Sequence, residues 1–317
     1  MIKANLRLLG AMLAASLLAQ GLSEALPSSF SYYNSILCLA GINAILAVSL
    51  NLVNGITGQF SLGHAGFMAI GAYASACLSV YAFPGLPGQL AFVLAMAGGA
   101  ALAGLAGYLV GLPSLRLRGD YLAIVTLGFG EIIRVAILNM DFLGGARGFI
   151  GIPAEASPFW VIFILLLCML GCVRLMQSTH GRAWLAIRED EVAAEAMGVD
   201  TTRYKVLAFS ISAAGAGTAG ALFAHLQAFI NPGSFDFMKS VDIVIMVVLG
   251  GMGSMSGSVL AALALTLLPE ALRPLAQLTG VDLRMVIYSL ALILMMIWRP
   301  GGLMGRRELW QLWKRHD

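Results

Sequence analysis

The amino-acid sequence predicts an all-α polytopic membrane protein, and three observations carry this prediction. The chain of 317 residues is 59% hydrophobic and only 11% charged, whereas soluble domains carry roughly 25% charged residues. No Asp, Glu, Lys or Arg occurs in the 91 residues from Ala25 to Leu115. Apolar runs recur along the chain, many close to the ~20 residues that a helix needs to cross a bilayer. A soluble protein of this size could not cover its surface with so few charges.

Nine apolar runs are candidate membrane segments. They lie at residues 8–22, 33–53, 60–83, 90–112, 121–139, 159–173, 206–229, 243–268 and 285–298. The first run follows Lys3 and Arg7, so it also fits a secretory signal peptide with small residues for cleavage near Ala19 or Ala25. A retained first span fits equally well. We expect eight to ten membrane segments in total.

Basic residues flank particular runs and predict the topology. They are Lys3, Arg7, Arg116, Arg118, Arg299, Arg306, Arg307, Lys314 and Arg315, together with those inside residues 174–205. The positive-inside rule places all of them on the cytoplasmic side. We therefore expect cytoplasmic N- and C-termini and one transmembrane domain over residues 1–317, with halves at about 1–140 and 141–305 and a short tail at 306–317. An inside C-terminus requires that the run at 243–268 be broken.

Two glycine-rich stretches, residues 54–66 and 250–257, interrupt the apolar runs. Each glycine weakens a helix by up to about 1 kcal/mol, and unwound backbone at membrane depth persists only where it is buried in protein or lines a wet cavity. Paired breaks of this kind point to a transport pathway, so we expect two discontinuous or re-entrant segments in a pseudo-repeat. The candidate pathway residues are Gly55, Thr57, Gly58, Gln59, Ser61, Gly63, His64, Gly250, Gly251, Gly253, Ser254 and Ser256. Alternatively, these glycines only allow close helix packing.

The charged segment, residues 174–205, holds ten charged residues in an otherwise apolar region. Within it, residues 188–198 predict a short helix, because Asp190 suits the positive first turn and Gly198 suits the C-terminal cap. Its apolar side chains form a small patch: Val192, Ala193, Ala196 and Met197. Such a helix suits docking into a groove on another protein, although a solvated connecting loop is the alternative.

Glu131 and Arg134 are charges inside an apolar run, three residues apart. Charges within the membrane are costly and are commonly paired or turned toward a cavity. We favour an intramembrane ion pair that holds helices together; a pathway or gating role is the alternative. A proton relay would need further titratable groups, and only His64 and His225 offer themselves. Outside the membrane, residues 142–153 form a glycine-rich loop that either touches a periplasmic partner or serves as a connector.

Several functions have no supporting motif. The G-x-G-x-x-G match at residues 215–220 lies inside an apolar run, so it predicts a helix-packing face rather than a nucleotide site. None of the four lysines follows a glycine, so no P-loop exists and any ATP must be used by another polypeptide. We expect no catalytic residue and no metal site, and the net charge of +3 is too small to suggest nucleic acid. The cysteines fit small residues at helix contacts: Cys38, Cys77, Cys168 and Cys172.

Four sequence blocks carry a specific resemblance. They are N-G-x-x-G-Q-x-S-L-G-H-x-G at 54–66, R-L-R-G-D-Y-L-A-I-x-T-L-G at 116–128, G-E-I-I-R at 130–134 and L-G-G-M-G at 249–253. Together with residues 182–209 they resemble the M-type permease of bacterial branched-chain amino acid ABC importers, over about residues 42–305. The glutamate-alanine-alanine signature of such permeases is degenerate here, because residues 195–198 keep the Glu, one Ala and the Gly.

The resemblance implies a multi-pass subunit of the bacterial inner (plasma) membrane that binds no cofactor and is not itself an enzyme. Its expected partners are a homologous H-type permease, two cytoplasmic ATPase subunits that use ATP, and a periplasmic substrate-binding protein. By this resemblance the charged segment is a coupling loop that seats on an ATPase through Arg188, Glu191, Ala193, Glu195, Ala196, Met197 and Gly198. The cargo would be branched-chain or other apolar amino acids. The alternatives are an ion-coupled secondary transporter and an ABC permease for urea or short amides.

Overall fold

The computed structural model describes residues 2–25, 31–83, 85–115, 117, 119–273, 289–290, 293–294, 297–299, 301–305 and 308. Its elements are α1 (Ile2–Ala25), α2 (Ser31–Asn51), η2 (Leu52–Ile56), α3 (His64–Cys77), η3 (Leu78–Ala82), α4 (Gly88–Ser114), α5 (Asp120–Leu138), η4 (Asp141–Leu143), η5 (Gly145–Arg147), β1 (Phe149–Ile150), α6 (Pro158–Gln177), α7 (Thr179–Glu189), α8 (Glu191–Ala196), α9 (Thr201–Gln227), β2 (Phe229–Ile230), η6 (Pro232–Phe235), α10 (Phe237–Gly250) and α11 (Met255–Ala271). The expected basic flanks at 116, 118, 306, 307, 314 and 315, and most of the run at 285–298, lie outside the described residues.

Six helical segments of the described chain are long and apolar enough to cross a membrane. They are Tyr32–Ile56, His64–Ala82, Gly88–Ser114, Asp120–Leu138, Pro158–Gln177 and Thr201–Gln227. Gly10–Gly21 and Met255–Ala271 are shorter apolar helices. The predicted all-α polytopic class is confirmed by this architecture, while the total of eight to ten membrane segments stays a prediction.

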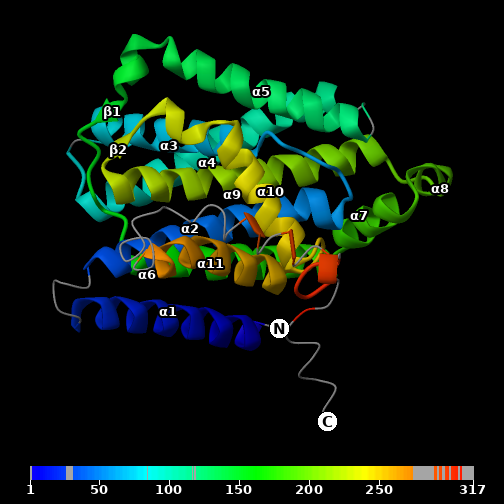
Figure 1. Cartoon of the computed structure of the whole chain (residues 1–317), viewed down its shortest axis with the longest axis horizontal. Helices are drawn as coiled ribbons and strands as arrows, with labels where there is room; N and C mark the ends of the chain where they lie inside the picture. Colours follow the sequence, from blue (N-terminus) through cyan, green and yellow to red (C-terminus); the bar gives the residue numbers. More distant parts are fainter. Residues whose placement is uncertain are drawn as a thin grey trace.

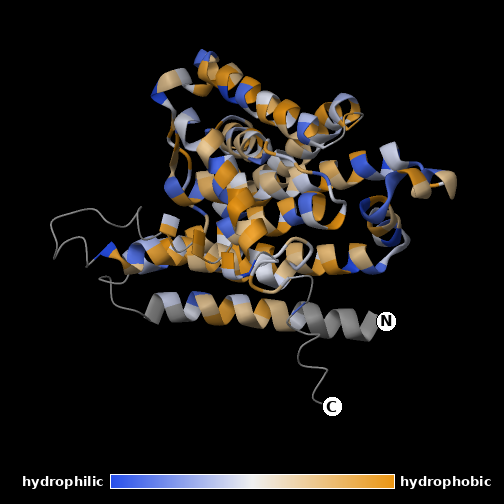
Figure 2. Cartoon of the chain, turned by 45° about the vertical axis from the view of Figure 1, so that its right-hand side comes forward, coloured by the Kyte–Doolittle hydropathy of each residue, from blue (hydrophilic) through white to orange (hydrophobic). Residues whose placement is uncertain are grey.

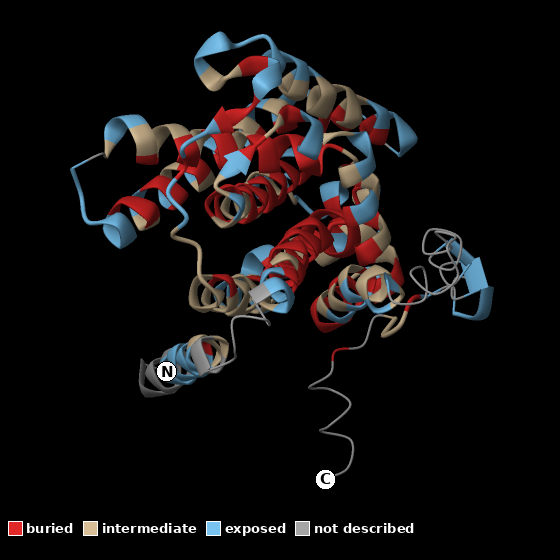
Figure 3. Ribbon diagram, turned by 60° about the vertical axis from the view of Figure 1, so that its left-hand side comes forward, coloured by how far each residue is buried: buried red, intermediate tan, exposed pale blue. Residues whose placement is uncertain are grey.

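The spans differ in how deeply they are buried. The apolar window of Tyr32–Ile56 is 89% buried, whereas that of Asp120–Leu138 is 22% buried. Buried residues accordingly gather in the helices at the middle of the bundle (Figure 3), while α1 and α5 run along its outside (Figure 1). Hydrophobic residues also cover outward faces (Figure 2), as lipid contact requires.

Helix α9 packs against α2, α3 and α4 through small residues. A Cβ atom on Gly71 of α3 would overlap the backbone of Gly217, and one on Gly220 would overlap the carbonyl oxygen of Met68. Close backbone approach of this kind is the usual role of small residues between membrane helices. The glycines at 215–220 therefore lie in helix contacts, in agreement with the packing interpretation.

The two ends of the bundle have different structures. At one end β1 pairs antiparallel with β2, with Phe149 opposite Ile230 and Ile150 opposite Phe229. This pairing ties the glycine-rich loop after α5 to the end of α9. At the other end α7 and α8 project from the bundle (Figure 1).

The chain leaves helical geometry at both glycine-rich stretches. Helix α2 continues through the single π-helical turn η2 and ends at Ile56, and α3 begins only at His64. Helix α10 ends at Gly250, and α11 begins at Met255 and packs back against α10. We call residues 57–63 the first break and residues 251–254 the second break. That both breaks lie at membrane depth and repeat one another stays a prediction.

Candidate functional site

Helix α8 is fixed at both ends by its local sequence. Asp190 precedes it, and its Oδ1 accepts hydrogen bonds from the backbone N–H groups of Val192 at 2.9 Å and Ala193 at 3.0 Å. An acidic N-cap of this kind stabilises a helix by about 1 kcal/mol. At the other end Gly198 has a φ of +85°, a left-handed conformation that glycine adopts without steric cost. The two residues that predicted the helix therefore delimit it.

The outer side of α8 is apolar and exposed. Val192 is 62% exposed and Met197 is 85% exposed. Ala193 and Ala196 are also exposed, whereas Ala194 is buried on the inner side. The side chains expected to form a docking patch are thus all at the surface of the chain, at the end of the molecule where α7 and α8 project.

The inner side of α8 is tied to the first turns of α9 by polar groups. Lys205 Nζ lies 2.6 Å from Glu191 Oε1, and the lysine side chain is only 5% exposed. Thr201 Oγ1 donates a hydrogen bond of 2.6 Å to Glu195 Oε1. Charge-assisted bonds with a buried partner are stronger than surface ion pairs, so these contacts hold α8 firmly on α9.

Helix α7 is anchored by a buried tryptophan. Trp184 has no exposed surface, and its indole Nε1–H donates to the backbone carbonyl of Tyr204 at 2.9 Å. Buried tryptophans usually satisfy this N–H while filling a large apolar volume. Helices α7, α8 and the start of α9 therefore form one packed unit.

Arg188, near the end of α7, connects this unit to the first break. Its Nη1 donates to the carbonyl oxygen of Gly55 at 3.1 Å, while its Nη2 pairs with Glu189 Oε1 at 2.9 Å. Its side-chain stem covers Gly58, where a Cβ atom would lie 2.7 Å from Arg188 Cγ. The guanidinium also lies beside Gly253 of the second break. One side chain thus contacts the charged segment and both breaks.

The end of α2 and the second break pack directly on each other. A Cβ atom on Gly55 would overlap both Asn51 Oδ1 and the backbone nitrogen of Gly253. Asn51 Oδ1 accepts from Gly253 N at 2.8 Å, and its Nδ2 donates to Ser254 O and Ser258 Oγ, both at 2.9 Å. Asn51 is fully buried. This single amide therefore fixes the turn between α10 and α11.

The first break is held mainly by residues close to it in sequence. Asn54 Oδ1 accepts from Ser61 N at 3.1 Å, and Asn54 Nδ2 donates to Ser61 O at 3.4 Å. Thr57 Oγ1 donates to the backbone carbonyl of Val53 at 2.6 Å. Beyond these local bonds, Leu62 N donates to Thr126 Oγ1 on α5 at 3.1 Å.

One side chain of the first break is not satisfied. Gln59 is 7% exposed, and neither its Oε1 nor its Nε2 has a hydrogen-bond partner within the described part of the chain. A buried amide without partners costs about 1–3 kcal/mol per group. By contrast, His64 at the start of α3 lies 2.9 Å from Ser49 Oγ through its Nε2. The strain of the first break is therefore concentrated at Gln59.

Residues 301–305 cover the second break. Leu303 N donates to Leu249 O at 2.7 Å, and Met304 N donates to Gly250 O at 3.2 Å. These bonds satisfy carbonyl groups at the end of α10 that have no partner within their own helix. The chain that follows the last apolar run thus returns to the α10–α11 turn.

Glu308 completes this contact at the start of α11. Its carboxylate is buried and accepts from Met255 N at 2.8 Å, Ser256 N at 3.0 Å and Ser256 Oγ at 2.5 Å. Ser254 caps the same helix by accepting from Gly257 N at 3.1 Å. A negative charge at a helix N-terminus is favourable because of the exposed N–H groups there. The N-terminus of α11 is therefore closed by a residue far along the chain.

A cavity of about 650 Å³ lies where these elements meet. Its walls come from the end of α2, the first break, α7, α10, the second break and the returning chain: Asn54, Gly55, Gly58, Phe60, Arg188, Val248, Met252, Gly301 and Gly305. Of the expected pathway residues, Gly55 and Gly58 line this cavity, and Gly253 lies beside Arg188 on its margin. Ser61, Gly63 and His64 instead lie near α5 and the start of α3.

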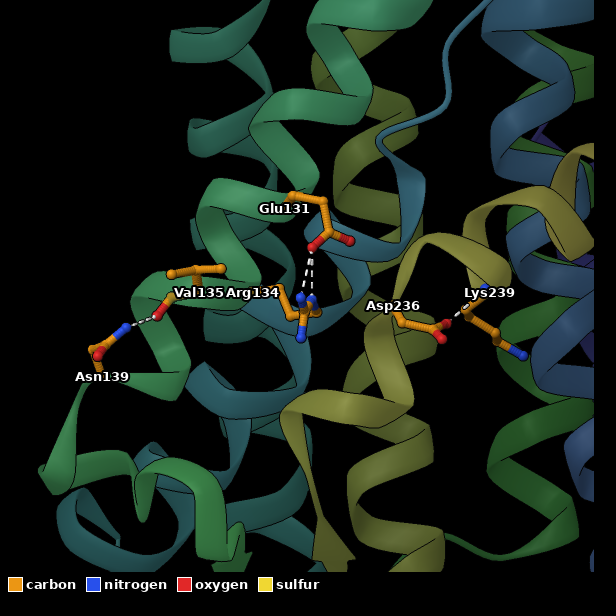
Figure 4. Close-up of polar contacts among 6 residues, drawn as sticks. All are labelled: Glu131, Arg134, Val135, Asn139, Asp236 and Lys239. Atoms are coloured by element: carbon orange, nitrogen blue, oxygen red, sulfur yellow. Dashed lines mark hydrogen bonds and ion pairs between the residues drawn. The ribbon is translucent and has the colours of Figure 1, made fainter.

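Glu131 and Arg134 both belong to α5. Arg134 Nε and Nη2 each lie 2.8 Å from Glu131 Oε2, with side-chain exposures of 28% for the arginine and 33% for the glutamate. The predicted ion pair is thus formed, but both residues are on one helix, so this pair does not itself hold two helices together. In Figure 4 the two side chains project on the side where Asp236 and Lys239 begin α10.

Three charged residues at the start of α10 escaped the sequence prediction. Asp236 caps the helix by accepting from Lys239 N at 2.9 Å, and Asp242 is exposed one turn on. Lys239 Nζ donates to Asn43 Oδ1 at 2.9 Å, and Asn43 Nδ2 donates to Thr266 Oγ1 at 2.9 Å. The sequence signal that could have identified them is the D-x-x-K-x-x-D spacing at residues 236–242, just before the apolar run at 243–268.

Asn51 and Glu308 were also missed, and each carries a weaker signal. Asn51 is an amide inside a long apolar run, where a polar side chain needs a buried partner. Glu308 is an acidic residue directly after two arginines in a basic tail. Within the described residues no cluster of three or more potential metal ligands occurs.

Comparison with known proteins agrees with this architecture. Residues 32–297 match the family described as "Branched-chain amino acid transport system / permease component". The chain is 40% identical over 301 residues to the high-affinity branched-chain amino acid transport system permease protein LivM of Escherichia coli K12, covering 84% of this chain and 68% of that protein. It is 27% identical to BraD of Pseudomonas aeruginosa PAO1 (90% and 99% covered) and 25% identical to LivH of E. coli K12 (86% and 94% covered).

No solved structure matches the chain. The family match spans most of the sequence, including the six long apolar helices and the charged segment. This chain therefore belongs to the family of permease components of branched-chain amino acid transport systems.

Proposed function

We propose that this chain is the membrane-spanning subunit of an ATP-driven importer for branched-chain or other apolar amino acids. Two of its relatives, LivM and LivH, are named as permease proteins of a high-affinity branched-chain amino acid transport system in one organism. The presence of two such permeases in one organism supports a pairing of this chain with a homologous H-type permease. Two cytoplasmic ATPase subunits would use ATP, and a periplasmic binding protein would deliver the amino acid; this chain itself binds no cofactor.

The observation that carries the proposal is the construction of α8. Its inner side is bonded to α9 through Glu191 and Glu195, while its outer side leaves Val192 and Met197 exposed. A short helix that is rigidly mounted and apolar outward suits a groove on another protein. The proposed coupling residues are Arg188, Glu191, Ala193, Glu195, Ala196, Met197 and Gly198.

Coupling would proceed through the packed unit formed by α7, α8 and the start of α9. When the ATPases bind ATP and approach each other, the groove that holds α8 moves. The Lys205–Glu191 and Thr201–Glu195 bonds transmit this movement to α9. Arg188 transmits it to the carbonyl of Gly55 and so to the two breaks.

The two breaks would form the part of the pathway that changes shape. The 650 Å³ cavity between them has room for an amino acid. Because the Gln59 amide has no partner in this conformation within the described residues, a second arrangement of the first break that satisfies it would lie close in energy. We assign the pathway to Gly55, Thr57, Gly58, Gln59, Ser61, Gly63, His64, Gly250, Gly251, Gly253, Ser254 and Ser256.

The proposed topology follows the distribution of basic residues. The transmembrane domain of residues 1–317 would lie in the inner membrane with cytoplasmic termini, halves at about 1–140 and 141–305, and a tail at 306–317. The charged segment would lie on the same cytoplasmic side. Its position at the opposite end from the paired strands β1 and β2 supports this orientation (Figure 1).

The test is uptake by the importer rebuilt in proteoliposomes with its second permease, ATPases and binding protein. We expect ATP-dependent uptake of a branched-chain amino acid, and no uptake by this chain alone. The double variant Ala196→Asp, Met197→Asp should lose both the co-purifying ATPases and uptake, because two charges cannot enter an apolar groove without a cost of several kcal/mol.

A matched variant controls for added charge. Thr179→Asp with Thr202→Asp places the same charges on exposed residues at the N-termini of α7 and α9, where acidic groups are favourable. It should assemble and transport like the wild type. Retention of the ATPases by the α8 variant would refute the docking assignment, and accumulation of solute by the lone chain without ATP would favour an ion-coupled transporter.

A further inference from the structure

Three helices meet near the middle of α5. Ala65 N at the start of α3 donates to Ser240 Oγ in the first turn of α10 at 3.1 Å. A Cβ atom on Gly66 would lie 2.8 Å from Gly130 Cα. Gly130 is about 15 Å along α5 from Asp120, at 1.5 Å per residue, which is half of a hydrocarbon core of ~30 Å. Helices α3 and α10 therefore begin beside the centre of a membrane span.

Charged residues surround this meeting point. Glu131 and Arg134 lie within one turn of Gly130, and both side chains are about one-third exposed. Asp236, Lys239 and Asp242 lie within about one turn of Ser240, and Asp242 is exposed. Lipid does not accommodate exposed charges at this depth; such residues face water or another protein. The surface where α5 meets η6 and α10 is thus not a lipid-facing surface.

The Glu131–Arg134 pair retains unused bonding capacity. Both contacts from Arg134 go to a single carboxylate oxygen, Oε2. Among the described residues, neither Glu131 Oε1 nor Arg134 Nη1 has a partner. Lys239, the other cation nearby, is instead turned into the bundle toward Asn43. The pair therefore offers one guanidinium NH2 group and one carboxylate oxygen on the exposed side of α5.

An α-amino acid carries the complementary charges on neighbouring atoms, a carboxylate and an ammonium group. Building on the proposed function, we propose that Glu131 and Arg134 hold these two charged ends as the amino acid crosses the membrane. Arg134 binds the carboxylate, as guanidinium groups do, and Glu131 accepts from the ammonium. The second permease subunit closes this face, which also presents the partly exposed side chain of Leu127, one turn before Glu131, and the exposed side chain of Met238 to the apolar part of the cargo.

Water access tests where this face lies. In the complete importer in proteoliposomes, Leu127→Cys, partly exposed and on the same face of α5 as Glu131 and Arg134, should react with a charged methanethiosulfonate reagent, and bound leucine should slow the reaction. The matched control is Leu105→Cys on α4, which is 55% exposed and should stay unreactive in lipid. The unsubstituted chain serves as the baseline for its four native cysteines. Failure of Leu127→Cys to react in the transporting importer overturns the proposal.

Substitutions test the pair itself. Arg134→Gln and Glu131→Gln should each lower ATP-dependent leucine uptake about tenfold or more, the equivalent of one lost charge-assisted bond, while the complex still assembles and hydrolyses ATP. The swap Glu131→Arg, Arg134→Glu restores the ion pair but exchanges the positions of the charges. A purely structural pair would recover uptake in the swap, which would refute a substrate contact; we expect uptake to stay low.

The wild-type importer separates this inference from the proposed function. Absence of ATP-driven uptake in the wild type would remove the proposed function and this inference with it. Normal uptake in the wild type, in Arg134→Gln and in Glu131→Gln would leave the importer intact and refute the inference alone.

Discussion

The two glycine-rich breaks meet at Arg188 but are held in different ways. The first break is braced by its neighbours in sequence, since Asn54 bonds to Ser61 at both its carbonyl and its amide. The second break is braced from far away, by Asn51 on α2 and by Glu308 after the last apolar run. The first break also contains Gln59, whose side-chain amide has no hydrogen-bond partner in the part of the chain that the structure describes. The helix ends on both sides of the second break are capped.

This difference indicates which break changes shape more easily. Apart from the Leu62–Thr126 bond to α5, the hydrogen bonds of the first break are local. Within the described residues the Gln59 amide has no partner. This break can therefore rearrange with less change to distant helices. The second break cannot move unless α2 or the returning chain at 301–308 moves with it. We therefore expect the first break to act as the mobile element and the second to act as its support.

The largest loss of stability should come from a substitution that forces the end of α2 away from the second break. Gly55→Val would push a side chain into Asn51 and the backbone of Gly253, and the packed surroundings have no space to absorb it. We expect the variant to lose about 3 kcal/mol or more of stability and to fail to assemble with its partners. The loss of stability is measured as a fall in the thermal unfolding midpoint in detergent. Gly171→Ala, where a Cβ meets nothing within 4 Å, should unfold at or slightly above the wild-type temperature. Equal midpoints for the two variants would contradict the contact.

A smaller loss of stability should distinguish substitutions of Asn51, which supports the second break, from those of Asn54, which supports the first. Asn51→Leu removes three bonds and leaves the buried N–H of Gly253 unpaired, which should cost about 2–4 kcal/mol. Asn54→Leu removes two bonds to Ser61, of which one is long, and should cost about 1–2 kcal/mol. Chemical or thermal unfolding of both variants in the same detergent shows which variant loses more stability. The comparison between the breaks fails if Asn54→Leu proves the more damaging.

The smallest effect should be local to the second break. Glu308→Gln keeps the shape of the side chain but weakens its bonds to Met255 and Ser256, at about 1 kcal/mol. Hydrogen exchange of these two amides should become several-fold faster, while exchange at residues 57–63 stays unchanged. Faster exchange at both breaks would show that they are not supported separately.

Local patterns in the sequence predicted much of this site. The caps of α8, Asp190 and Gly198, lie within a few residues of the helix that they delimit. The breaks are visible because glycine and serine cluster where an apolar run should continue. The apolar patch on α8 could be predicted from helical spacing. It is exposed in the structure because the opposite side of the helix packs on α9.

Contacts between distant residues could not be predicted in this way. Asn51 is 202 residues from Gly253, and Glu308 is 52 residues from Ser256. No periodicity links such positions, so only the folded arrangement assigns their partners. The pairing of Glu131 and Arg134 on one helix could be read from their spacing, yet whether they join α5 to another helix depends on packing that the spacing does not contain.

We propose that Arg188 is the link through which movement of α8 reaches the two breaks. The most direct test of this proposal is uptake per ATP hydrolysed by the complete importer carrying Arg188→Met, which keeps the long stem over Gly58 but removes the bond to Gly55 O. We expect the ATPases still to bind and hydrolyse ATP while uptake falls about tenfold, which corresponds to the loss of a charged hydrogen bond. Uptake and hydrolysis that remain coupled as in the wild type would contradict the proposal.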